Sequence, residues 1–141
     1  MPTIRMSYGT VTSMTITLAS LANNTSVTSS SVTNAVNLFT DALVEVIIAT
    51  GTGTAATGYC EIFVKGSIDN SDFATDTGDR KVASIATPTA STTYKTVINV
   101  APAFSGMMPQ YWQIRVRNVS GAALASSGSS AAYSGILLTS T

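Results

Sequence analysis

The amino-acid sequence predicts an all-β chain, folded as an antiparallel β-sandwich of the jelly-roll or Greek-key kind with about seven to eight strands. Three observations support this class. Apolar and polar residues alternate with a period of two in several segments, which is typical of strands with one buried face. Polar turns rich in glycine, asparagine, aspartate and proline separate these segments. No internal repeat stands out, which argues against solenoids and propellers.

The expected strands are the runs of β-branched, aliphatic and aromatic residues between these turns. Residues 14–18 alternate apolar side chains with threonine, which indicates a half-buried strand. Residues 43–50 are rich in valine and isoleucine and predict a central strand buried on both faces. In chain order, the expected strands are 14–18, 43–50, 59–65, 82–86, 94–100, 112–117 and 134–138.

The core should be built from one face of these strands. Trp112, Ile114 and Val116 fall on the same side of their strand, whereas the glutamine and arginines between them fall on the other. Cys60 lies in an apolar run and is expected to be a buried thiol. As the single cysteine of the chain, it cannot form an internal disulfide.

Helical spacing of apolar residues occurs at Val32, Ala35, Val36 and Phe39. The threonine and asparagines among them are poor helix formers, so a loop is expected here in preference to a short helix.

Composition argues against an enzyme. The chain has no histidine, and histidine is the usual general base and the commonest metal ligand near neutral pH. Serine and threonine are abundant, but no motif pairs one of them with a base, and only three lysines are available. Glu45 and Glu61 lie in predicted strands and could face each other as a carboxylate pair. Outward positions suit them better, with Glu61 paired across strands to Arg115 or Arg117. We therefore expect no catalytic site and no cofactor.

The charge balance also limits the possible partners. Seven basic and seven acidic residues give a net charge of zero, so neither nucleic acid nor an anionic membrane is an expected partner. No apolar run approaches the ~20 residues needed to cross a bilayer, and no signal peptide is evident. The protein is expected to be made in a cytoplasm. A neutral surface favours association between copies of the chain.

Two segments resemble ligand-binding motifs. Residues 51–56 read GTGTAA, which matches the glycine pattern of a dinucleotide-binding turn. The next strand begins at Tyr59, which leaves no room for the helix that this motif requires, so a hairpin loop is expected. Four of the seven acidic residues, Asp69, Asp72, Asp76 and Asp79, lie in one stretch. They predict either a solvated loop or a loose calcium site, although their order differs from that of an EF-hand.

The candidate interaction residues lie in two places. Residues 1–12 form an N-terminal arm before a single sandwich domain at 13–141, and the alternating Ile4, Met6 and Tyr8 of the arm have no obvious partner strand in their own domain. We expect the arm to add as a strand to a neighbouring chain. Exposed loop residues form the second group, namely Met107, Met108 and Tyr111.

Three segments carry a resemblance to a known group: NLFTDALVEV at 37–46, IFVKGSIDN at 62–70 and WQIRVRNVSGAAL at 112–124. They resemble small β-sandwich virion proteins of tailed bacteriophages, which include head decoration (cement) and tail-associated subunits. The resemblance implies a jelly-roll-like subunit, often trimeric, that clamps neighbouring capsid subunits or caps part of the tail. The Gly-Ser-x-Asp segment at 66–69 is also similar to discoidin-like carbohydrate-binding sandwiches, although the paired cysteines of those proteins are absent here.

The sequence therefore predicts a non-enzymatic virion structural protein. A capsid decoration subunit is the first expectation, acting as a homo-oligomer, with a trimer favoured, on the major capsid or other virion proteins. A tail, neck or fibre-adaptor subunit is the alternative, and a carbohydrate-binding module is the second alternative.

Overall fold

The computed structural model describes residues 2–75 and 78–140. These residues form ten strands and one short 3₁₀ helix. The elements are β1 (Ile4–Tyr8), β2 (Thr12–Ser13), β3 (Ser26–Thr28), β4 (Val32–Thr33), β5 (Asp41–Ala49), β6 (Tyr59–Ser67), β7 (Arg80–Ala86), β8 (Thr93–Asn99), η1 (Ala101–Phe104), β9 (Tyr111–Val119) and β10 (Ser130–Ser140).

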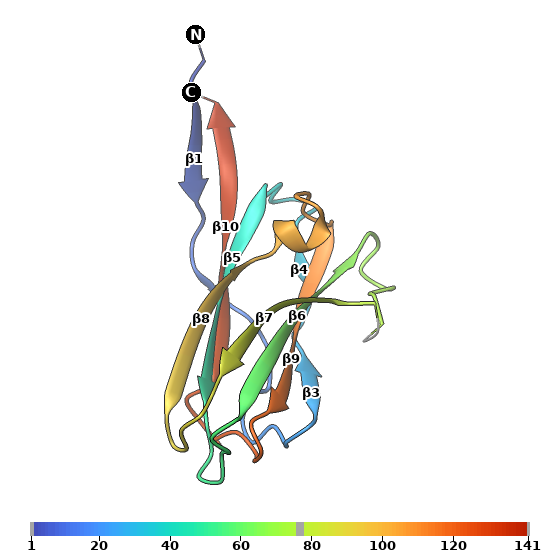
Figure 1. Cartoon of the computed structure of the whole chain (residues 1–141). Coiled ribbons are helices and arrows are strands. Elements are labelled where there is room, and N and C mark those ends of the chain that lie inside the picture. The colour runs from blue at the N-terminus through green and yellow to red at the C-terminus, as the bar shows by residue number, and fades with distance from the viewer. Residues whose placement is uncertain (1, 76–77, 141) are drawn as a thin grey trace.

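The strands form two antiparallel sheets packed face to face (Figure 1). The β10 sheet has the order β1-β10-β5-β8, and β2 continues the line of β1 along β10. The β9 sheet has the order β3-β9-β6-β7, and β4 continues the line of β3 along β9. With β1/β2 and β3/β4 each counted as one interrupted strand, the ten segments fill eight positions. The first position pairs with the eighth, the second with the seventh, the third with the sixth and the fourth with the fifth. This nested order is that of a jelly roll, which confirms the predicted fold class.

The core lies between the two sheets and follows the predicted alternation. Trp112, Ile114 and Val116 of β9 are fully buried, and the Trp112 ring meets Tyr133 of β10 edge-on with centroids 5.4 Å apart. Cys60 is fully buried as predicted, and this burial raises the pKa of its thiol to about 11. The opposing row from β5 is also fully buried and comprises Ala42, Val44, Val46 and Ile48.

The prediction that residues 43–50 are buried on both faces is wrong. Leu43, Glu45 and Ile47 lie on the outer side of β5 and are half-buried, because no layer of the described chain covers that side of the β10 sheet.

The segment 14–18 also differs from its prediction. Met14 and Leu18 are buried as the alternation requires, yet the segment belongs to neither sheet. It carries the chain from β2 in the β10 sheet to β3 in the β9 sheet. A crossing segment cannot keep a hydrogen-bond ladder with either sheet, so apolar alternation occurs here without a strand.

At 32–39 the chain forms the short strand β4 followed by a turn, not a helix. Asn34 stabilises this turn, because its side-chain Nδ2 donates to the Phe39 carbonyl at 3.0 Å and its Oδ1 accepts from the Phe39 N–H at 2.7 Å. An asparagine side chain thus bonds the backbone groups that a helix would otherwise use.

The N-terminal arm has a partner strand in its own domain, contrary to the sequence-based expectation, whereas its addition to a neighbouring chain stays a prediction. β1 pairs with the C-terminal half of β10, with Ile4 opposite Ser140 and Tyr8 opposite Ile136. The predicted strand at 134–138 is extended in the structure to the eleven residues of β10, which is long enough to pair with β5 and then with β1. The two paired strands, here called the terminal ribbon, project beyond the rest of the sandwich (Figure 1).

Candidate interaction surface

One face of the terminal ribbon is apolar and exposed. Ile4, Met6 and Tyr8 alternate along β1 and therefore share a face, and Met6 lies opposite Leu138 of β10. The exposed fractions of these four side chains are 72%, 60%, 64% and 56% respectively. We call this set the ribbon face. Three of the predicted interaction residues are thus brought together, and Leu138 is an addition that the sequence did not indicate.

The ribbon face continues onto the outer face of the β10 sheet. Val11 and Val97 are 72% and 54% exposed, and with Leu43 they line a shallow hollow of about 200 Å³ on that side. Glu45 borders the same hollow, and its carboxylate lies 2.7 Å from the Lys95 ammonium. Because this ion pair cancels both charges, the surface around the apolar residues is close to neutral.

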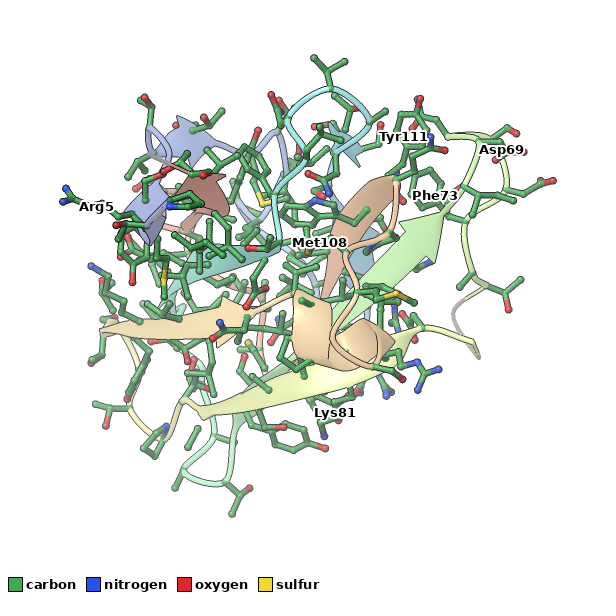
Figure 2. The ribbon with its side chains drawn as sticks, turned by 90° about the horizontal axis from the view of Figure 1, so that it is seen from above. Arg5, Asp69, Phe73, Lys81, Met108 and Tyr111 are labelled. Carbon is green, nitrogen blue, oxygen red and sulfur yellow. The ribbon has the colours of Figure 1, made fainter. Side chains whose placement is uncertain are left out.

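The other three predicted residues lie elsewhere. Met107 is 76% exposed in the loop after η1, whereas Met108 is partly buried and packs against the core. Tyr111 begins β9 and is half-buried. Viewed from above, Met108 and Tyr111 lie well away from Arg5 of the ribbon (Figure 2). The six predicted residues therefore do not form one surface.

Two carboxylates of the acidic loop, those of Asp69 and Asp79, are bonded within the chain. Asp69 accepts hydrogen bonds from the backbone N–H groups of Ser71 and Asp72 and from the Ser67 hydroxyl. Asp79 forms an ion pair with Arg115. Asp76 lies outside the described residues. Within the described residues, no group of three or more histidine, cysteine, aspartate or glutamate side chains is placed to hold a metal ion.

We expect Asp69 to stay ionised in acid. The hydrogen bonds from the backbone of Ser71 and Asp72 hold the pKa of its carboxyl well below the usual range. Since the folded pKa is below that of the unfolded chain, this carboxylate stabilises the loop above about pH 4, and the effect is lost as the pH falls through the folded pKa. In an NMR titration, the Ser71 amide resonance should respond to Asp69 at a lower pH than an ordinary aspartate carboxyl would give, and Asp69→Asn should abolish that response. A midpoint near pH 4 would contradict these hydrogen bonds.

Glu45 and Glu61 cannot act as a carboxylate pair, because they lie on the outer sides of different sheets. Glu61 binds Lys81 at 2.6 Å and Arg117 at 3.5 Å. The predicted cross-strand pairing of Glu61 with Arg117 is therefore confirmed.

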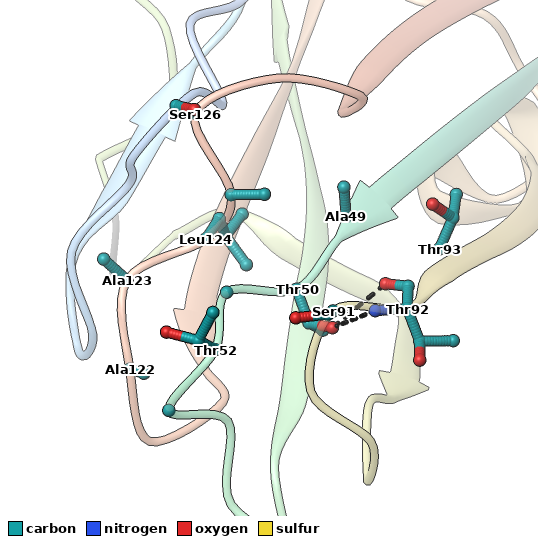
Figure 3. Close-up of a pocket in the computed structure, with 13 residues that line it drawn as sticks. Ala49, Thr50, Thr52, Ser91, Thr92, Thr93, Ala122, Ala123, Leu124 and Ser126 are labelled. Atoms are coloured by element: carbon teal, nitrogen blue, oxygen red, sulfur yellow. Dashed lines mark hydrogen bonds between the residues drawn. The ribbon is translucent and has the colours of Figure 1, made fainter.

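The glycine-rich segment forms a loop at the end of the sandwich opposite the terminal ribbon (Figure 1). It continues from β5 to β6 without a helix, as predicted. Three loops at this end surround an open hollow of about 680 Å³ (Figure 3). Thr50 is buried beside it, and its hydroxyl bonds both the Thr92 N–H, at 2.9 Å, and the Thr92 carbonyl, at 3.0 Å. The lining has neither charged nor aromatic side chains and consists of residues 49–53, 91–93 and 122–126.

Asn118 was not identified from the sequence, although its side chain connects the loops at this end by hydrogen bonds. Asn118 is fully buried in β9, where its Nδ2 donates to the carbonyls of Leu21 at 2.8 Å and Ala122 at 2.7 Å. Its Oδ1 accepts from the Ser120 N–H at 2.9 Å. The sequence did contain an indication of this role. Asn118 continues the inward row of Trp112, Ile114 and Val116, and an amide buried there without hydrogen-bond partners would be costly.

These features define an eight-position jelly-roll β-sandwich with an exposed apolar edge ribbon. No helix among the described residues is long and apolar enough to span a membrane. The chain matches no protein-family model and no curated protein sequence.

Solved structures with a similar fold come from different kinds of protein. BuGH86, solved in complex with neoagarooctaose, aligns with a TM-score of 0.54 and 12% identity over 95% of this chain and 20% of its own. A chain from infectious bursal disease virus (Gx strain) aligns with a TM-score of 0.50 and 13% identity over 97% of this chain and 32% of its own. The xylan-binding module CBM15 aligns with a TM-score of 0.45 and 13% identity over 96% of this chain and 94% of its own. At such identities, the similarity shows the fold alone.

Proposed function

We propose that this protein is a non-enzymatic structural subunit of a virus particle, most specifically a capsid decoration protein of a tailed bacteriophage. The observation that carries the proposal is the ribbon face, where four large apolar side chains are more than half exposed on a projecting ribbon. Exposed apolar residues gathered in one place are typical of a surface that another protein covers. The resemblance of residues 37–46, 62–70 and 112–124 to phage virion proteins supplies the kind of partner.

The proposed mechanism is adhesive. The jelly roll provides a rigid body, and the terminal ribbon reaches past it to a neighbouring subunit. Contact with other virion proteins would bury the ribbon face and the apolar part of the outer face of the β10 sheet. The net charge of zero means that copies of this chain do not repel one another, which suits a homo-oligomer packed onto a particle.

The position on the particle decides between a decoration subunit and a tail, neck or fibre-adaptor subunit. A capsid decoration protein covers a repeating lattice, whereas a tail or neck component occurs at one unique site. Quantitative mass spectrometry of purified particles should therefore find this chain at a copy number close to that of the major capsid protein. A few copies per particle would favour the tail alternative.

Removing the apolar side chains of the ribbon face should release the protein from its particle. We expect the triple variant Ile4→Ser, Met6→Ser and Tyr8→Ser to fold normally, because these residues contribute little to the core. Its binding to particles stripped of the native protein should be reduced by at least about tenfold, measured by co-sedimentation. Ile68→Ser, at a residue 82% exposed on the acidic loop, is the matched control and should bind as the wild type does. Unchanged binding of the triple variant would contradict the proposal.

A carbohydrate-binding module is the second candidate, and the hydroxyl-rich hollow at 49–53, 91–93 and 122–126 favours it. Hydroxyl and backbone groups can hydrogen-bond a sugar there. The buried Trp112, in contrast, is not available for stacking. Calorimetric titration with xylan and agar oligosaccharides tests this candidate, and saturable binding that is lost in Gly53→Trp would support it over the virion role.

A further inference from the structure

The β10 sheet has two edge strands, β1 and β8, and β1 is the one that lies on the terminal ribbon. The Gly9 N–H donates to the Gly135 carbonyl at 2.8 Å, in the same register that pairs β1 with β10. Hydrogen-bonded and non-hydrogen-bonded pairs alternate along antiparallel strands. Ser7 and Arg5 therefore occupy the other hydrogen-bonded positions, with their backbone groups directed toward β10.

The remaining residues of β1 are Ile4, Met6 and Tyr8, and their backbone N–H and C=O groups point away from β10. Within residues 2–75 and 78–140, no strand pairs with β1 on that side. Each of the three residues has one donor and one acceptor there, so the edge presents six backbone groups to an added strand.

β1 is complementary to a second copy of itself. In an antiparallel pair with Met6 opposite Met6 of the second copy, Ile4 lies opposite Tyr8 in both directions. In all three pairs, the outward N–H and C=O groups of one copy then face those of the other copy. Hydrogen bonds can therefore form at every pair. Other registers with the same parity pair fewer of these residues.

The side chains agree with this register. The apolar side chains of both copies fall on one face, so two ribbon faces merge into one apolar surface. Arg5 is the one charged residue of β1, and it lies opposite Ser7 of the second copy, not opposite another arginine. Like charges are therefore not placed directly across from each other.

We infer that two copies of this chain pair antiparallel through β1, which joins their β10 sheets into one continuous sheet across a two-fold axis. Because the terminal ribbon projects beyond the sandwich, this arrangement places the two bodies at opposite ends of the paired strands (Figure 1). The inference deepens the proposed function, on which it rests for the expectation that copies of this chain associate. It differs from the trimer that the phage resemblance favours.

Cysteine cross-linking tests the pairing and its register. Opposed residues at a hydrogen-bonded antiparallel pair have Cα atoms about 5.5 Å apart, within the range of a disulfide. Met6→Cys should therefore form a covalent dimer under mild oxidation, whereas Arg5→Cys alone should form no disulfide-linked dimer, because Ser7 lies opposite it. Arg5→Cys mixed with Ser7→Cys should cross-link. The native Cys60 does not compete, because it is fully buried and its thiol is protonated at neutral pH.

Sedimentation of the full chain without cross-links provides the second measurement. The wild type should change from monomer to dimer as its concentration rises. Met6→Pro should lose the dimer, because it removes an edge-facing N–H that β10 does not use, while Met6→Thr keeps that N–H and should retain dimerisation. Circular dichroism confirms that each variant is folded.

A trimer, a monomer at all concentrations, or cross-linking by Arg5→Cys alone in preference to Met6→Cys would overturn the inference. These results are separable from the proposed function. If the wild type stays monomeric at every concentration and is nevertheless found on purified particles, the pairing is wrong and the virion role stands. If the dimer forms but the chain is absent from particles, the virion role is wrong and the pairing stands.

Discussion

Replacing Asp79 with alanine is expected to destabilise the fold by about 3–5 kcal/mol, because it removes one partner of a buried ion pair. The Asp79 Oδ2 and Arg115 Nε atoms are 2.6 Å apart, and the two side chains are only 2% and 7% exposed. The Arg115 guanidinium also lies over the Phe63 ring, 4.0 Å from its centroid. Without the carboxylate, the guanidinium keeps its desolvation cost and loses its interaction with Asp79. Urea unfolding followed by Trp112 fluorescence measures the change.

A matched control is available on the other sheet. Glu45 and Lys95 form an ion pair at 2.7 Å, but their side chains are 38% and 59% exposed. Glu45→Ala should therefore change the free energy of unfolding by at most about 1 kcal/mol. The double variant Asp79→Leu with Arg115→Met removes both charges together and should recover most of the stability lost in Asp79→Ala. Equal effects at Asp79 and Glu45 would contradict the burial of the Arg115 pair.

Asn118→Ala is expected to lower the free energy of unfolding by about 2–4 kcal/mol. This is a large effect for a polar side chain that was not among the core residues predicted from the sequence. The variant leaves the buried Ser120 N–H without its acceptor, which by itself costs about 1–3 kcal/mol. The cavity left by the amide adds to this cost. Both carbonyls bonded by Nδ2 keep a second donor, from the Leu124 N–H and the Ser120 hydroxyl, which limits the loss.

Asn37→Ala is the control for this variant. Asn37 is exposed, and its side-chain amide donates a 3.3 Å hydrogen bond to the carbonyl of Thr33 at the end of β4. We expect its effect to stay within about 0.5 kcal/mol in the same unfolding assay. If Asn118→Ala were as mild as Asn37→Ala, the buried amide network would not stabilise the loops at that end.

The long strands could be predicted from the sequence because their alternation reports burial directly. The expected strand at 112–117 corresponds to β9, and the one at 43–50 corresponds to β5, with shifts of at most two residues at each end. The length of β10 was underestimated for a physical reason. Its first residues, Ser130 to Ala132, are small and give little contrast between faces, so only pairing with β5 shows that they form a strand.

The pairing of β1 with β10 could not be predicted from the sequence. Alternation at Ile4, Met6 and Tyr8 indicated a strand, but a local pattern does not say which of the later strands lies beside it. The same limit applies to Leu138, which joins the ribbon face only through the β1–β10 register. Asp79 lies in a loop, and its burial depends on Arg115, which is 36 positions away. Composition near Asp79 therefore predicted a solvated loop.

The nested strand order also has a consequence for the sequence of events in folding. The innermost pair, β6 with β7, closes a short loop, whereas the outermost pair, β1 with β10, joins segments separated by almost the whole chain. The entropy cost of closing a loop rises with its length, and the terminal ribbon gains little burial in return. We therefore expect the ribbon to be the last element to form and the first to open, with its amide protons exchanging faster than those of β5 and β9. Because the ribbon face forms only after the sandwich has folded, a chain that is still folding does not yet present it. Association through the ribbon face is therefore restricted to folded chains.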